Sequence, residues 1–168
     1  MDKRWIYILI IFIIGVSALY IIASSSNTIG CATVDVNTFV ITLPDSFNID
    51  GTDGNSATLI NRNNGEKLIV EDLGKGNFID DMLLNYTKNS PNNGKHVKIE
   101  NKTITHNNIT IQTVYIIDNN TINSTSYFIK FNHTFTIKAN NFSDNESIDN
   151  NIKYIIDSLV RDYKQTQD

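Results

Sequence analysis

Three histidines and one acidic loop are the side chains of this sequence best suited to metal or acid–base chemistry. The histidines are His96, His106 and His133, and none of them stands four residues from another. A zinc site needs several such ligands to converge on one point. Because two of the three fall in expected turns, the sequence predicts exposed histidines, with no metal site and no bound cofactor.

The acidic loop DSFNIDGTDGNS carries Asp45, Asp50 and Asp53. A calcium-binding loop of the EF-hand type needs oxygen ligands at positions one, three, five and twelve, with glycine at six. The segment NIDGTDGNS breaks that register, so we expect a solvated turn.

No arrangement typical of a catalytic site is present in the sequence. The acidic neighbours Glu71-Asp72 and Asp80-Asp81 would point to opposite faces of a strand or diverge on a helix. The nucleophile motifs G-x-S-x-G and S-x-x-K are missing, and GKGN lacks the spacing of a phosphate loop. The sequence therefore predicts no catalytic residues and a protein that is not an enzyme.

The N-terminal region predicts a membrane anchor. From Trp5 to Ala23 the chain carries no charge, and about 20 apolar residues span the hydrocarbon core of a bilayer. Lys3 and Arg4 precede this run and indicate that the N-terminus is cytoplasmic. The alternative is a cleaved signal peptide, whose apolar core is usually shorter. We expect residues 1–24 to form a cytoplasmic stub and single-pass anchor, with membrane contact through residues 5–24 and the remainder outside.

The stretch SSSNTIGC contains Cys31, the only cysteine, so the chain forms no internal disulfide. Cys31 is a candidate for lipidation, but Thr28 stands where a bacterial-type lipobox wants leucine, and the cysteine is distant from the apolar run. We therefore favour a polar tether over residues 25–36, followed by a folded domain over residues 37–164.

Alternating residues indicate strands in that domain. In TFVITLP, Phe39, Ile41 and Leu43 share one face. RNNGE reads as a hairpin turn, and HNN, NNTINS and NH separate further strands. A hairpin turned at Asn132-His133 would place two sets on one face: Tyr127, Ile129 and Phe131, and Phe135, Ile137 and Ala139.

Two segments have helical spacing. The first, FIDDMLLNYTKN, has Asn77 as its expected N-cap. The second begins with an expected capping box, Ser143 to Glu146, and should continue for about 20 residues. Its apolar stripe consists of Ile148, Ile152, Ile155, Ile156, Leu159 and Tyr163. The element order predicts an α+β fold, an antiparallel sheet of about six to seven strands packed by two helices.

This arrangement resembles the PsbP-like family, and more narrowly the small membrane-anchored PsbP-related proteins of methanogenic archaea. The segments that carry the resemblance are TFVITLP, FIDDMLLNYTKN, NHTFTIKAN and ESIDNNIKYIIDSLV, within residues 37–160. The resemblance implies an antiparallel sheet covered by helices. It implies no photosynthetic role, because no metal or docking motif of the plant members is found here.

Asparagine is unusually frequent, with 24 residues in the chain. Eight of them fit the N-x-[ST] glycosylation sequon, twice the number expected by chance, and are Asn85, Asn101, Asn108, Asn119, Asn123, Asn132, Asn141 and Asn145. Asparagine is also favoured in turns for backbone reasons. The excess is therefore open to both interpretations.

Two hypotheses of function follow. The net charge is −4 and the basic residues are scattered, so no nucleic-acid partner is expected. The favoured hypothesis is an extracytoplasmic binding or accessory module that helps a larger envelope or membrane assembly. The alternative is an envelope protein that binds a small ligand or a metal, with or without hydrolytic activity, and that would use the acidic loop and the histidines.

Overall fold

The computed structural model describes residues 32–83 and 97–161, and from Thr33 onward these belong to one folded unit. The expected anchor, Cys31, Asn85, His96 and Tyr163 lie outside the described residues. Within the described residues, no helix is both long enough and apolar enough to cross a membrane.

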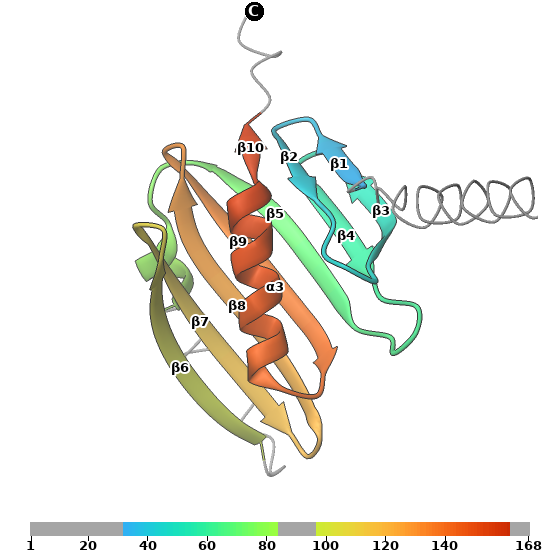
Figure 1. Cartoon of the computed structure of the whole chain (residues 1–168). Helices are drawn as coiled ribbons and strands as arrows, with labels where there is room; N and C mark the ends of the chain where they lie inside the picture. Colours follow the sequence, from blue (N-terminus) through green and yellow to red (C-terminus); the bar gives the residue numbers. More distant parts are fainter. Residues whose placement is uncertain (1–31, 84–96, 162–168) are drawn as a thin grey trace, which may run out of the picture. The chain divides into compact units, whose positions relative to one another are not determined.

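The core of the fold is a seven-stranded antiparallel sheet (Figure 1). Its strand order is β3-β4-β5-β9-β8-β7-β6, so the last four strands of the chain's meander lie side by side. The strands are β3 (Asn48–Asp53), β4 (Ser56–Ile60), β5 (Lys67–Lys75), β6 (Val97–His106), β7 (Ile109–Asp118), β8 (Thr121–Lys130) and β9 (His133–Phe142).

Residues with positive φ turn the three long hairpins. Asn107 and Asn108 connect β6 to β7 with φ of 48° and 63°, and Asn119 starts the β7–β8 turn with φ of 55°. Phe131 and Asn132 connect β8 to β9 with φ of 54° and 61°. Asparagine tolerates this conformation well, whereas a bulky residue such as phenylalanine adopts it rarely.

The expected position of the last turn was wrong by one residue. Because the turn lies at Phe131-Asn132 and not at Asn132-His133, Phe128 is opposite Phe135 and Tyr127 is opposite Thr136. A two-residue turn pairs the odd-numbered residues of β8 with the even-numbered residues of β9. Tyr127 therefore lies on the face opposite to Phe135, and the expectation that the two sets share one face was wrong.

A second, three-stranded sheet contains β1 (Thr33–Val36), β2 (Phe39–Thr42) and β10 (Val160–Arg161), in the order β1-β2-β10. Strand β1 occupies residues that we had assigned to the tether, and it buries Val34 and Val36. Strand β3 likewise forms where we expected only a solvated turn. Its pairing with β4 accounts for this difference, because that ladder satisfies backbone groups of a polar segment.

Helix α3 (Asn145–Ser158) has 14 residues, so it is shorter than expected. Its N-cap is Asp144, whose Oδ1 accepts a hydrogen bond from the Ser147 amide at 2.6 Å, one position beyond the expected Ser143 cap. The helix ends early because Leu159 is extended and the next two residues pair with β2.

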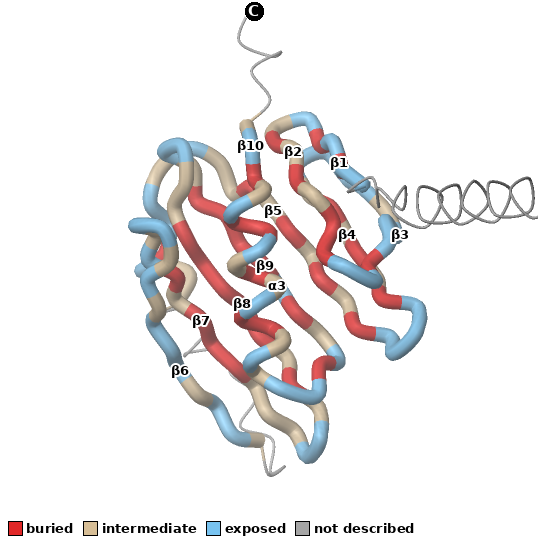
Figure 2. Tube along the Cα trace, in the orientation of Figure 1, coloured by how far each residue is buried: buried red, intermediate tan, exposed pale blue. Residues whose placement is uncertain are grey.

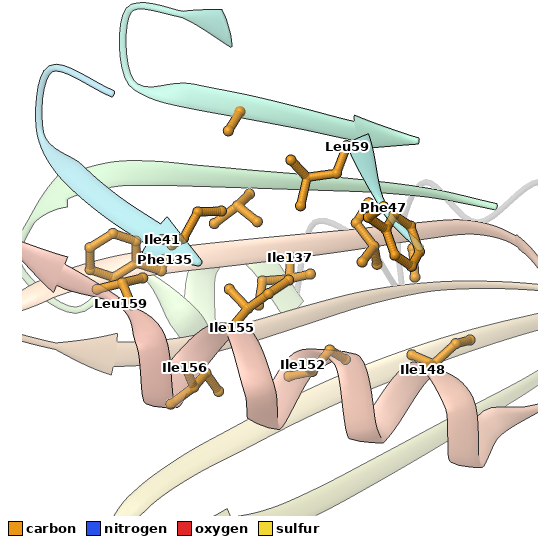
Figure 3. Packing of buried hydrophobic residues seen from close by; sticks show 14 of the residues in the cluster. Ile41, Phe47, Leu59, Phe135, Ile137, Ile148, Ile152, Ile155, Ile156 and Leu159 are labelled. Carbon is orange, nitrogen blue, oxygen red and sulfur yellow. The ribbon is translucent and has the colours of Figure 1, made fainter. Parts of the chain in front are cut away.

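One face of α3 packs on the seven-stranded sheet (Figure 1). We call the face of the sheet that α3 covers the α3 face. The helix contributes Ile148, Ile152, Ile155 and Ile156, all buried, as the apolar stripe predicted. Figure 2 shows that burial is concentrated beneath the helix, and Figure 3 shows Ile155 beside Ile137 of β9. Phe39 of β2 joins this core through edge-to-face contact with Phe135 at 5.7 Å between ring centroids.

A second helical segment begins at Ile79 and is described as far as Leu83. Asn77 caps it, as expected, because its Oδ1 accepts a hydrogen bond from the Ile79 amide at 3.1 Å. The Phe78 amide donates to Thr134 Oγ1, which attaches the segment to the face opposite to α3. The predicted fold class, a mainly antiparallel sheet with two helices, is confirmed.

Candidate functional site

A buried carboxylate connects α3 to the sheet. Asp149 receives a hydrogen bond from the Tyr115 hydroxyl of β7 and forms an ion pair with Lys102 of β6, whose Nζ lies 2.5 Å from Oδ2. The Asp149 side chain is 8% exposed and that of Lys102 is 48% exposed. One carboxylate thus joins three elements.

This cluster changes the acidity of Tyr115. Burial of the phenol raises the pKa of Tyr115 far above its ordinary value, and its hydrogen bond to Asp149 raises it further. The hydroxyl therefore stays protonated and keeps donating to the carboxylate. These contacts hold β6, β7 and α3 together, so we assign the cluster a structural role.

A histidine–carboxylate pair links β5 to β9. His133 Nδ1 lies 3.0 Å from both oxygens of Asp72, and the two side chains are 13% and 3% exposed. The Gly74 amide also donates to Asp72 Oδ1 at 2.8 Å, where the register between β5 and β9 shifts. A hydrolytic triad would need a hydroxyl or thiol beside the other ring nitrogen. In the described part of the chain no such contact to His133 occurs.

A more exposed histidine–aspartate pair joins β6 to α3. His106 Nε2 is 2.9 Å from both oxygens of Asp157, and the Asn107 amide nitrogen lies 2.8 Å from Oδ1. The bond to His106 holds the pKa of Asp157 below its usual value, and the Asn107 bond acts in the same direction.

The two described histidines do not form one site. They lie on β6 and β9, three strand spacings apart, or about 14 Å, and each binds a different aspartate. Among residues 32–83 and 97–161, no group of three His, Cys, Asp or Glu side chains is arranged to hold a metal ion.

The aspartates of the acidic loop do not pair with either of the described histidines. Asp50 forms an ion pair with Lys67 at 3.1 Å, and Asp45 and Asp53 are exposed. The adjacent acids Glu71 and Asp72 diverge to opposite faces of β5, as expected, with Glu71 near Lys138 at 3.4 Å. A hollow of about 230 Å³ beside Leu83, Asn101 and Gln112 includes no acidic or histidine side chain among its described lining residues.

The described sequon asparagines occupy three kinds of position. Asn108, Asn119 and Asn132 are exposed in hairpin turns with positive φ, so turn geometry accounts for their residue type. Asn101 is exposed on β6 and Asn141 on β9. Asn123 and Asn145 are less accessible, since Asn123 Oδ1 accepts from the Asn141 amide at 2.9 Å and Asn145 Oδ1 is buried.

Sequence reasoning missed Asp149, although a signal was present. Asp149 stands three residues before Ile152 and seven before Ile156, so it lies on the apolar stripe of α3. A carboxylate on such a stripe requires a buried partner. Which residues supply that partner depends on the pairing of β6 and β7, and no local pattern shows it.

Comparisons with known proteins give a likeness in fold alone. No family model and no curated protein matches this sequence. The solution structure of cyanobacterial PsbP (CyanoP) from Synechocystis sp. PCC 6803 is similar, with a TM-score of 0.41 and 11% sequence identity. The match covers 74% of this chain and 86% of that one.

Proposed function

We propose that this chain is a membrane-tethered extracytoplasmic accessory module that binds and supports a larger envelope assembly. In this proposal residues 5–24 form the anchor, and the unit from Thr33 onward presents its surface outside the membrane. As part of this proposal, the sequence motifs relate the chain to the PsbP-like family.

This proposal rests on the contacts that three aspartates form within the domain. Asp72, Asp149 and Asp157 each bind a side chain from another element, namely His133, Tyr115 and His106. These contacts join strands to each other or to α3. The three aspartates and their partners therefore stabilise the framework of the domain. A function based on surface recognition needs such a framework but needs no reactive centre.

The topology and the partner are tested separately in cells that express the full chain. A protease added outside intact cells should cleave a C-terminal epitope tag and leave an N-terminal tag protected. Photocrosslinking in the same cells should then give a recurrent adduct with another envelope protein. Full protection of the C-terminal tag would contradict the topology, and recovery of uncrosslinked chain alone would contradict the accessory role.

The His133–Asp72 pair is the observation that favours the alternative, a metal- or small-ligand-binding envelope protein. Imidazole and carboxylate are suitable ligands for zinc, and water could complete the coordination. Zinc should then raise the melting temperature of the wild-type chain and leave that of a His133→Gln variant unchanged. An equal response in both proteins, or no response, would remove this candidate.

A further inference from the structure

The two edges of the seven-stranded sheet differ. The β3 edge has six residues and a register shift between Ile49 and Gly51. Short edge strands and bulges protect an edge from pairing with another chain. The β6 edge has ten residues whose register with β7 is uninterrupted. In the part of the chain that the structure describes, the outer side of β6 has no paired strand (Figure 1).

The β6–β7 turn defines which backbone groups of β6 point outward. Asn107 and Asn108 both have positive φ, as in a type I′ turn, so His106 and Ile109 form the hydrogen-bonded pair that closes it. Hydrogen-bonded and non-bonded pairs alternate along an antiparallel ladder. The even-numbered residues of β6 therefore bond to β7, and the odd-numbered ones, including Asn101 and Thr103, direct their N–H and C=O groups away from the sheet.

The charges on β6 favour one register for pairing with a second β6. Its even-numbered side chains include Lys98, Glu100 and Lys102, which share the α3 face with Asp149. If Asn101 lies opposite its own symmetry mate, Glu100 faces Lys102 of the other copy, and two-fold symmetry repeats this pair. A shift by two residues in either direction places Glu100 opposite Glu100 or Lys102 opposite Lys102. A shift by four, with Ile99 on the axis, pairs Glu100 with Lys98 but uses only residues 97–101 of β6, whereas the first register uses residues 97–105. Charge and strand length together therefore favour the first register.

We propose that the β6 edge is a self-association surface, on which a second copy of this chain pairs antiparallel with Asn101 at the two-fold axis. This would join the two sheets into one through outward-facing groups of the odd-numbered residues. Ile99, which is 44% exposed, would then lie opposite Thr103 of the second copy. Figure 2 shows that β6 carries mainly exposed and intermediate residues, unlike the buried strands at the centre.

Disulfide trapping in the full chain tests this register. With Cys31 replaced by serine, Asn101→Cys should form an intermolecular disulfide under mild oxidation, because Cα atoms of a hydrogen-bonded pair are about 5.5 Å apart. Thr105→Cys is the matched control, since Thr105 is also exposed and odd-numbered. In the proposed register it lies opposite Val97 of the second copy, about 26 Å from its own symmetry mate.

We expect Asn101→Cys to give several-fold more of a species with twice the 19.0 kDa chain mass than Thr105→Cys. Equal yields at the two positions would indicate random collision, and no product at Asn101→Cys would indicate no such pairing. Either result would overturn the proposal. Because the comparison is made on purified full chain in detergent, it does not depend on the proposed location or envelope partner.

Two further variants separate strand pairing from other contacts. Adding Thr103→Pro to Asn101→Cys should lower the disulfide yield several-fold, because proline removes an outward N–H and leaves the bonds to β7 intact. Thr103→Ala, which keeps that N–H, is its control. Adding Glu100→Lys should also lower the yield, since it places two cations together. An undiminished yield with Glu100→Lys in a folded chain would overturn the register, even if Thr103→Pro fails to fold.

Discussion

The Lys130 ammonium donates a hydrogen bond to the Leu159 carbonyl oxygen at 2.8 Å and a second to the Ile156 carbonyl at 2.5 Å. Lys130 belongs to β8, and α3 has no basic residue in its last turn. A cation from the sheet therefore satisfies the carboxyl end of the helix, where carbonyl groups lack intrahelical partners. Burial lowers the pKa of Lys130, opposed in part by the charge of Asp157.

Replacing Lys130 with methionine should lower the free energy of unfolding by about 1–3 kcal/mol, because carbonyls at the end of α3 lose their donor. Chemical denaturation followed by circular dichroism measures this change. Lys138→Met is the control, since Lys138 forms only a surface pair with Glu71 at 3.4 Å and should change stability by about 0–1 kcal/mol. Equal effects of the two substitutions would contradict the capping role.

Tyr115→Phe should be destabilising near neutral pH by about 1–3 kcal/mol, because the Asp149 carboxylate loses a donor in a buried position. The pKa of folded Tyr115 is raised, so its stabilising effect is complete below the ordinary tyrosine value of about 10 and is lost as pH rises above it. Unfolding measured from neutral to alkaline pH should therefore show a shallower decline for the variant. Parallel curves for the two proteins would contradict this assignment.

Asp157→Asn should have its largest effect above the ordinary pKa of aspartate. The pKa of folded Asp157 is lowered mainly by its hydrogen bond to His106, so the stabilisation is present above the unfolded value and is lost as pH falls through the folded one. The effect should be small because the Asp157 side chain is 48% exposed. Melting temperatures of variant and wild type should converge in acid, and a difference that persists there would contradict this origin.

If the domain is extracytoplasmic in a cell that glycosylates, the exposed turn asparagines Asn108, Asn119 and Asn132 should be modified before Asn123 and Asn145. The two disfavoured residues have side-chain oxygens that are already bonded or buried. Glycopeptide mass spectrometry of the native protein measures this order. Thr110→Ala removes the Asn108 sequon while keeping the asparagine that the turn needs, and it should remove one glycan. A native mass equal to that of the bare chain would contradict the prediction.

The sequence predicted those elements whose signals are local. The spacing of Ile148, Ile152, Ile155 and Ile156 predicted the buried face of α3, because a helix displays every third or fourth residue on one side. The hairpin at Asn63-Asn64-Gly65 was also predicted from a local signal, the turn residues themselves. The Asn61 amide donates a hydrogen bond to the Glu66 carbonyl across this turn at 2.9 Å. Gly65 has φ of 78°, a conformation that glycine adopts without strain.

The failures concern tertiary pairing. Strand β1 forms in the expected tether because it pairs with β2. The strand propensity of its residues alone does not reveal that pairing. The β8–β9 turn was misplaced because Phe131 adopts a positive φ that its residue type disfavours. The partners of Asp149 were missed because they come from strands more than thirty residues away in the sequence, as the separation of 34 residues from Tyr115 shows.

The three-stranded sheet also bears on the order of events during synthesis. Strand β10 pairs with β2, and the Ser158 hydroxyl accepts a hydrogen bond from the Thr42 amide across 116 residues of sequence. Strand β2 can pair with β1 early, but it gains this second partner only when residues 160–161 have emerged from the ribosome. Contacts of such long range slow folding. A nascent chain halted before Val160 would therefore lack β10, and β2 would keep a free edge until release.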